Sequence, residues 1–108
     1  MRRTLFGISF LLVSACSMTL PVSGRMADGT ETFTGEATGY MDGGGNLKIA
    51  SNKGRTCQGN FVYVTSRNGE GVFTCSDGKS GPFKFVSTGT RGTGTGAIGG
   101  EPFIFTFG

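Results

Sequence analysis

The 108-residue sequence contains no histidine and no tryptophan, and it has only three prolines and three cysteines. Without histidine the chain lacks the commonest general base and the commonest transition-metal ligand, and Ser-His-Asp or Cys-His catalysis is excluded. Glycine is abundant instead, with 21 residues, and each interior glycine destabilises a helix by about 1 kcal/mol relative to alanine. The composition therefore predicts one small domain without long helices, and no enzyme activity, cofactor or metal is expected.

The N-terminus has the features of an export signal. Arg2 and Arg3 follow the initial methionine, and residues 5–13 form an apolar run that ends at two small residues. This run is too short for a membrane-spanning helix, which requires about 20 apolar residues. We therefore predict that residues 1–15 are a secretory signal peptide that is removed on export.

The end of this signal carries the motif Val13-Ser14-Ala15-Cys16. It resembles the lipobox of bacterial lipoproteins, in which an aliphatic residue and two small residues precede an invariant lipid-modified cysteine. The resemblance implies that Cys16 receives a diacylglyceryl group, becomes the first mature residue and is acylated on its amine. Ser17 in place of aspartate implies sorting to the outer membrane, with the domain in the periplasm or at the cell surface. The alternative is a plain secreted protein whose cleavage site carries a cysteine.

The apparent basicity of the chain depends on the signal peptide. The full sequence has a formal net charge of +3, but loss of Arg2 and Arg3 with the signal peptide lowers it to +1. Lys48, Lys53 and Arg55 are the nearest approach to a basic patch, and we interpret them as the solvated edge of a hairpin. Since the sequence shows no clustered cationic face, no nucleic-acid partner is expected.

The rest of the chain divides into a tether and a domain. Residues 16–30 comprise the anchor cysteine and a stretch without sustained periodicity, and we interpret residues 17–30 as flexible. Residues 31–108 consist of short runs rich in Phe, Val, Ile, Tyr and Thr, separated by turn residues. The predicted strands span residues 32–40, 46–51, 56–65, 71–76, 83–88, 93–98 and 103–107. Seven short strands with tight connections predict an all-β domain, a small antiparallel meander that closes into a barrel or a sandwich.

Alternation along the predicted strands indicates which side chains fill the interior. Phenylalanine recurs at every second position over residues 83–85 and 103–107, which places the rings on one face of each strand. Glycine alternates in the same way over residues 69–71 and 92–96, which leaves one face of those strands without side chains. We therefore expect the rings to form the core and to lie over these glycines. A ligand pocket lined by the rings is the alternative.

Two cysteines, Cys57 and Cys75, remain besides the one in the lipobox. In an exported domain of this size a disulfide between them is expected, and the closed loop of 19 residues gives a stabilisation of about 3 kcal/mol. A hairpin that pairs Cys57 with Cys75 also sets two phenylalanines, at positions 61 and 73, opposite glycines. A competing hairpin, with residues 68–69 in a type I′ turn, sets Val62 opposite Cys75 and prevents the bond. We prefer the first register.

Several short sequence matches resemble functional motifs but lack their context. Residues 94–99 fit the dinucleotide-binding pattern G-x-G-x-x-G, but too little chain follows for the helix that this site requires. The most distinctive stretch contains Asp77, Lys79 and Ser80. We predict a structural turn in which Asp77 binds its own backbone, with a binding loop as the alternative. An enzyme would have to use these three residues, and we do not expect one.

Together these features favour a non-catalytic outer-membrane lipoprotein that acts as a structural or interaction module of the cell envelope. Its expected partners are the membrane, through the lipid on Cys16, and an envelope protein or peptidoglycan. The alternative is an anchored inhibitor of a lysozyme or another cell-wall hydrolase. A nearly neutral domain is unfavourable for that role, since a basic lysozyme favours an acidic partner.

Overall fold

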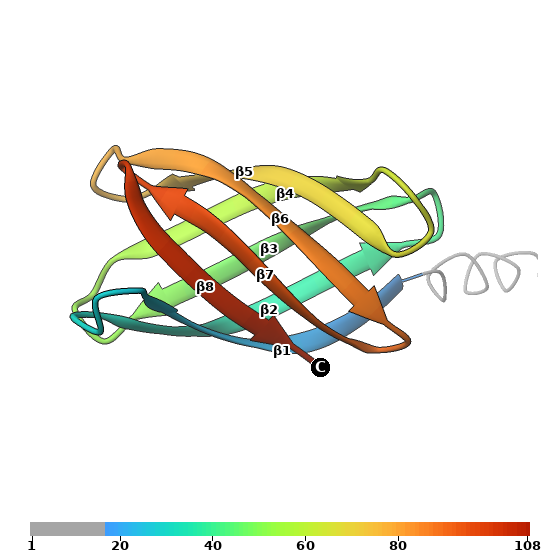
Figure 1. The fold of residues 1–108 in the computed structure, drawn as a ribbon, viewed down its shortest axis with the longest axis horizontal. Coiled ribbons are helices and arrows are strands. Elements are labelled where there is room, and N and C mark those ends of the chain that lie inside the picture. Colours follow the sequence, from blue (N-terminus) through green and yellow to red (C-terminus); the bar gives the residue numbers. More distant parts are fainter. Residues whose placement is uncertain (1–16) are drawn as a thin grey trace, which may run out of the picture.

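The structure is a computed structural model in which residues 17–108 are described, so the predicted signal peptide and Cys16 lie outside the described residues. Eight strands follow one another along the chain: β1 (Ser17–Met26), β2 (Thr32–Tyr40), β3 (Gly44–Ser51), β4 (Thr56–Tyr63), β5 (Asn68–Cys75), β6 (Ser80–Thr88), β7 (Arg91–Ile98) and β8 (Glu101–Phe107). Each strand pairs with the next and β8 pairs with β1, so the antiparallel sheet closes into a barrel (Figure 1). The predicted all-β meander is confirmed as a barrel, with eight strands where seven were expected. Within the described range no helix could cross a membrane.

The additional strand is β1, and the prediction of a flexible tether over residues 17–30 is wrong for most of its length. β1 pairs with β2 along nearly its whole length and with β8 over its second half. Leu20, Val22 and Met26 point inward with the period of two that defines a strand, but a proline and a glycine between them obscure that period in the sequence. Without β1 the neighbouring strands would have open edges with unpaired backbone groups, so closure of the barrel favours the strand.

Phenylalanine rings fill the barrel, and glycines on the adjacent strands make room for them. The ring of Phe105 is buried and covers Gly94 on β7, where an added Cβ would lie 2.6 Å from the ring atom Cε1. The rings also pack edge to face with one another, as Phe33 and Phe103 do with centroids 5.2 Å apart. The same ring-over-glycine contact pairs Phe107 with Gly92, Phe85 with Gly69 and Phe83 with Gly71. The predicted packing of rings over alternating glycines is therefore confirmed.

The hairpin of β4 and β5 has the register that we preferred from the sequence. Cys57 lies opposite Cys75, and the two form the predicted disulfide, with Cα atoms 3.9 Å apart. Phe61 and Phe73 each lie opposite a glycine of the partner strand. Residues 64–67 form the connecting loop, so the competing type I′ turn does not occur. This hairpin pins two adjacent strands of the barrel close to one of its ends.

Candidate functional site

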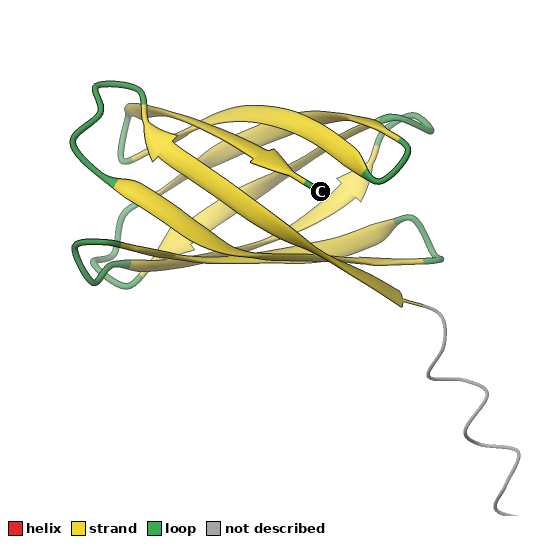
Figure 2. Cartoon of the chain, turned by 90° about the horizontal axis from the view of Figure 1, so that it is seen from below, coloured by secondary structure: helices red, strands yellow, loops and turns green. Residues whose placement is uncertain are grey.

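The two ends of the barrel differ in chemistry. The turns that follow β1, β3, β5 and β7 gather at one end, which we call the closed end. The turns that follow β2, β4 and β6 gather at the other end together with the start of β1, and we call this end the mouth (Figure 2). Charged side chains fill the closed end, whereas apolar side chains line the mouth.

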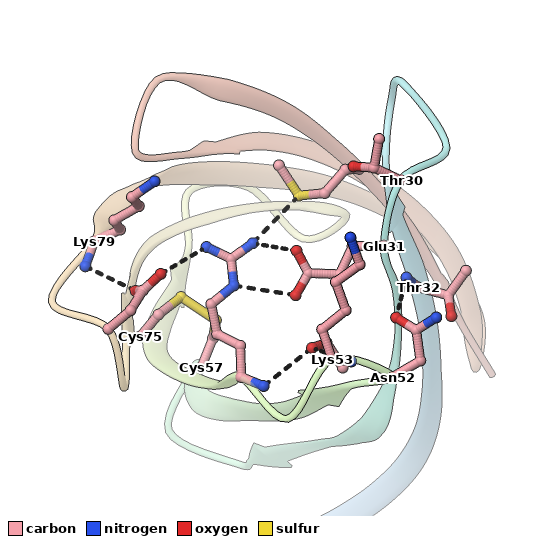
Figure 3. Close-up of polar contacts among 12 residues, drawn as sticks. Thr30, Glu31, Thr32, Asn52, Lys53, Cys57, Cys75 and Lys79 are labelled. Carbon is pink, nitrogen blue, oxygen red and sulfur yellow. Dashed lines mark hydrogen bonds and ion pairs between the residues drawn. A yellow bond between two sulfur atoms is a disulfide. The ribbon is translucent and has the colours of Figure 1, made fainter.

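The closed end is filled by Arg55, which directly precedes β4. Its guanidinium donates two hydrogen bonds to Glu31, from Nη2 to Oε1 at 2.7 Å and from Nε to Oε2 at 3.2 Å, and Nη1 donates to Asp77 Oδ2 at 3.1 Å (Figure 3). The guanidinium carbon lies 5.6 Å from the centre of the Phe33 ring, which is a cation–π distance. The side chains of Arg55 and Glu31 are only 14% and 10% exposed, so this ion pair is largely shielded from water.

Burial and ion pairing act against each other in this cluster. Burial favours neutral Glu31, but hydrogen bonds from Ser51 and Arg55 outweigh that effect and hold the pKa of Glu31 below its ordinary value. Burial also disfavours charged Arg55, whereas Glu31 and Asp77 together raise the pKa of Arg55 above its ordinary value. The backbone N–H of Lys79 and then Arg55 lower the pKa of Asp77. All three side chains therefore stay charged at neutral pH, and none is poised to transfer a proton.

The interpretation of Arg55 as part of a solvated hairpin edge is wrong. Lys48 and Lys53 are exposed as expected, but Arg55 is half-buried. Its partners Glu31 and Asp77 lie 24 and 22 residues away along the chain. No local sequence pattern connects residues so far apart, so the ion pairs depend on the pairing of β2 through β5, which brings the three turns to one end of the barrel.

The segment with Asp77, Lys79 and Ser80 forms the turn between β5 and β6 at the closed end. Asp77 Oδ1 accepts a hydrogen bond from the backbone N–H of Lys79 at 3.0 Å, which is the predicted turn contact. Ser80 begins β6, and its carbonyl accepts a hydrogen bond from the N–H of Gly99. Both oxygens of the Asp77 carboxylate thus hold structural contacts. The binding-loop alternative for these residues stays a prediction.

The mouth contains an apolar cavity of about 370 Å³. Its wall includes Leu20, Leu47, Phe61, Phe85 and Phe107, and none of the residues that line it is charged. Cavities of roughly 300 to 1,000 Å³ with apolar walls and few polar groups are typical of small-molecule sites, and barrel mouths are one of their usual places. The chemistry available here is the binding of an apolar group.

Aromatic rings give the cavity a preformed floor. The ring of Phe85 lies at its centre and contacts three others edge to face, with centroid distances of 5.1 Å to Phe61, 5.5 Å to Tyr63 and 5.5 Å to Phe107. Rings in edge-to-face contact stabilise one another by more than the burial of their surface alone provides. Polar groups border the cavity only at Ser17, the two tyrosines and Thr90.

The wall beside the mouth is incomplete along β1. β8 pairs with β1 from Val22 onward, so the first residues of β1 form a ladder with β2 alone. Met18 and Leu20, which belong to this singly paired segment, both line the cavity. The mouth is therefore bordered on one side by a strand edge.

Other hollows of the described residues are less suited to binding. The largest, about 890 Å³, is lined by residues of β1 and of β5 to β8, where exposed Arg25, Glu70 and Lys84 carry charges of both signs. Its charged, exposed walls distinguish this hollow from the mouth cavity, which no charged residue lines. Within residues 17–108 no group of three histidine, cysteine, aspartate or glutamate side chains is placed to hold a metal ion.

No protein-family model and no curated protein matches this sequence. Among solved structures the chain is similar to a redesigned β-barrel, mFAP1, bound to DFHBI, with 15% identity, a TM-score of 0.67, and coverage of 82% of this chain and 90% of that one. It is also similar to a de novo designed fluorescence-activating β-barrel, with 14% identity, a TM-score of 0.63, and coverage of 82% of this chain and 88% of that one. At these identities the similarity shows the barrel fold alone.

Proposed function

We propose that this chain is a non-catalytic outer-membrane lipoprotein, anchored through Cys16, that serves as an interaction module of the cell envelope by binding a small apolar molecule in its mouth. The cavity of about 370 Å³ carries this proposal, because it is preformed, apolar and open at one end. The similar barrel mFAP1 is described as bound to DFHBI, which supports the capacity of this fold to hold a small molecule. The closed end supports the proposal less, since its walls are charged and Arg55 already pairs with Glu31 and Asp77.

A pair of matched alanine substitutions tests the cavity. Ala37 lines the mouth on β2, whereas Ala50 is exposed on the outer wall of β3. Titration with dansyl-labelled undecanoic acid should show saturable binding to the wild type and to Ala50→Phe. Ala37→Phe places a ring in the cavity and should weaken binding about tenfold or more, which corresponds to about 1.4 kcal/mol.

Urea unfolding of both variants provides the control for folding. Ala37→Phe is expected to keep a cooperative transition, because Ala37 lines the cavity and the added ring can occupy part of its volume. Equal binding by all three folded proteins would refute the mouth as the site.

The anchor is tested separately by labelling cells with radioactive palmitate. Wild-type protein should carry the label and sediment with the outer membrane, because two acyl chains already hold a protein stably at a bilayer. Cys16→Ser should lose the label and appear in the soluble fraction. Label or membrane association that survives this substitution would refute lipidation at Cys16.

A further inference from the structure

The proposed anchor attaches directly to the barrel, without a tether. β1 begins at Ser17, the residue after Cys16, and consecutive Cα atoms are about 3.8 Å apart. Ser17 also lines the mouth cavity. β1 runs from the mouth toward the closed end (Figure 1), so a lipid on Cys16 would be attached at the mouth. Arg55 directly precedes β4, which begins at the closed end, so it lies at the far end of the barrel.

The border of the mouth is apolar on its outside as well as its inside. We call five side chains at the mouth the rim, which β1, β2, β4 and the loops after β2 and β4 contribute: Met18, Tyr40, Met41, Tyr63 and Val64. The rim holds five of the eight large hydrophobic side chains that are exposed within the described chain, and Met41 is 82% exposed. Exposed apolar groups that gather at one place mark an interaction surface, and tyrosine is favoured where water meets lipid.

The distribution of charge also differs between the two ends of the barrel. Exposed Arg67 and Arg91 lie in or beside the turns of the mouth, where Asp42 is the only carboxylate of those turns. The closed end instead carries four carboxylates, at residues 28, 31, 77 and 101, against three cations, at residues 53, 55 and 79, so its formal charge is −1. A surface of anionic lipid attracts each nearby arginine by about 1 kcal/mol. An anionic bilayer therefore complements the mouth better than the closed end.

We propose that the rim is a membrane-docking surface that seats the mouth on the lipid leaflet holding Cys16, so that the cavity opens toward the acyl chains. The ligand of the cavity is then a lipid acyl chain, which enters past the singly paired edge of β1. This inference rests on the proposed anchor and apolar site, and it adds the orientation and the ligand class. Docking covers the exposed apolar rim and leaves the charged closed end in water.

The chain carries its own reporters for this orientation. It has two tyrosines and no tryptophan, and both tyrosines, Tyr40 and Tyr63, belong to the rim. Lipoprotein purified from membranes is reconstituted into vesicles of phosphatidylethanolamine and phosphatidylglycerol, with and without doxyl-labelled acyl chains. A docked rim lies about 5 to 10 Å into the boundary of headgroups and acyl chains. Doxyl lipid should therefore quench the tyrosine fluorescence strongly, and aqueous acrylamide should quench it weakly.

A reporter at the opposite end provides the matched control. The variant Tyr40→Phe/Tyr63→Phe/Lys53→Tyr lacks both rim tyrosines and has a single tyrosine, in an exposed turn of the closed end. Its fluorescence should respond to acrylamide and not to doxyl lipid. The reverse pattern in the two proteins would overturn the proposal. Rim tyrosines shielded from both quenchers, together with a dimer in analytical ultracentrifugation, would overturn it in favour of a second copy as the partner.

Substitutions on the rim and in the cavity together separate docking from ligand binding. Met41→Asp should reduce quenching by doxyl lipid several-fold, whereas Val72→Asp, at an exposed valine of the barrel wall, should not change it. Ala37→Phe should block the cavity and leave docking intact, so the two proposals can fail independently. If palmitate does not label Cys16, docking is tested with unlipidated protein added to the same vesicles. Doxyl lipid should then still quench the tyrosine fluorescence, and absence of this quenching overturns docking.

Discussion

Replacing Gly94 with alanine tests whether rings over glycines determine the packing of the barrel. The added Cβ would lie 2.6 and 2.7 Å from Cε1 and Cε2 of the Phe105 ring, which is closer than carbon atoms approach in folded proteins. The ring cannot move away freely, because Phe83 and Phe103 contact it. Overpacking of this kind costs about 1–3 kcal/mol, and restriction of the unfolded chain offsets about 0.4–1 kcal/mol of it. We expect a net loss of about 1–2 kcal/mol, with a fall in Tm of about 4–8 °C for each kcal/mol.

Gly39→Ala is the matched control for Gly94→Ala. Gly39 also lies in a strand, β2, but no atom lies within 4 Å of the position of an added Cβ. This variant should be as stable as the wild type or more stable by about 0.4–1 kcal/mol. Urea unfolding followed by circular dichroism measures both variants. Equal stability of the two alanine variants would refute the packing role of the glycines, whereas partial rescue of Gly94→Ala by Phe105→Leu would support it.

Three further predictions concern the closed end and its neighbouring disulfide. Arg55→Leu leaves Glu31 buried without its partner and should lower the free energy of unfolding by about 3–5 kcal/mol, and Glu31→Leu in the same chain should restore much of the loss in urea unfolding. Since the folded-state pKa of Glu31 is lowered, its stabilising contribution is complete above its ordinary value of 4.5 and is lost as the pH falls through the folded-state value. As the pH falls through the acid range, the free energy of unfolding should therefore decrease more steeply for the wild type than for Glu31→Gln. Equal slopes of the free energy of unfolding against pH would contradict this. Cys57→Ala/Cys75→Ala removes the constraint that the disulfide places on the unfolded chain. The free energy of unfolding should therefore fall by about 3 kcal/mol relative to the oxidised wild type in urea unfolding.

The parts of the fold that sequence predicts here are those determined by local alternation. Phenylalanine and glycine alternate with period two along β6, β7 and β8, and this pattern fixes which face of each strand points inward. The hairpin register around Cys57 and Cys75 also follows from local matching, because only one register sets each ring opposite a glycine. The disulfide was therefore predictable together with the antiparallel meander, whereas the choice between a barrel and a sandwich stayed open.

Features that depend on contacts between distant parts of the chain were not predictable. β1 has an outward proline and an inward glycine, so its strand character becomes clear only when β2 and β8 supply partners on both sides. The ion pair of Arg55 with Glu31 joins two turns that are distant in sequence and meet only at the closed end. The mouth cavity collects side chains from most of the strands, and the sequence indicated only that rings could line a pocket.

The distribution of branched apolar residues allows the binding site to be located by one NMR titration. Beyond the predicted signal peptide the chain has two leucines, Leu20 and Leu47, and both line the mouth cavity. Ile98 is buried at the closed end, and Ile104 borders the hollow on the outer wall. Methyl-labelled protein titrated with dodecanoic acid should show saturable shifts of the two leucines, with both of these isoleucines unchanged. Shifts at Ile98 or Ile104 without shifts at the leucines, or no shift at any methyl, would contradict binding in the mouth.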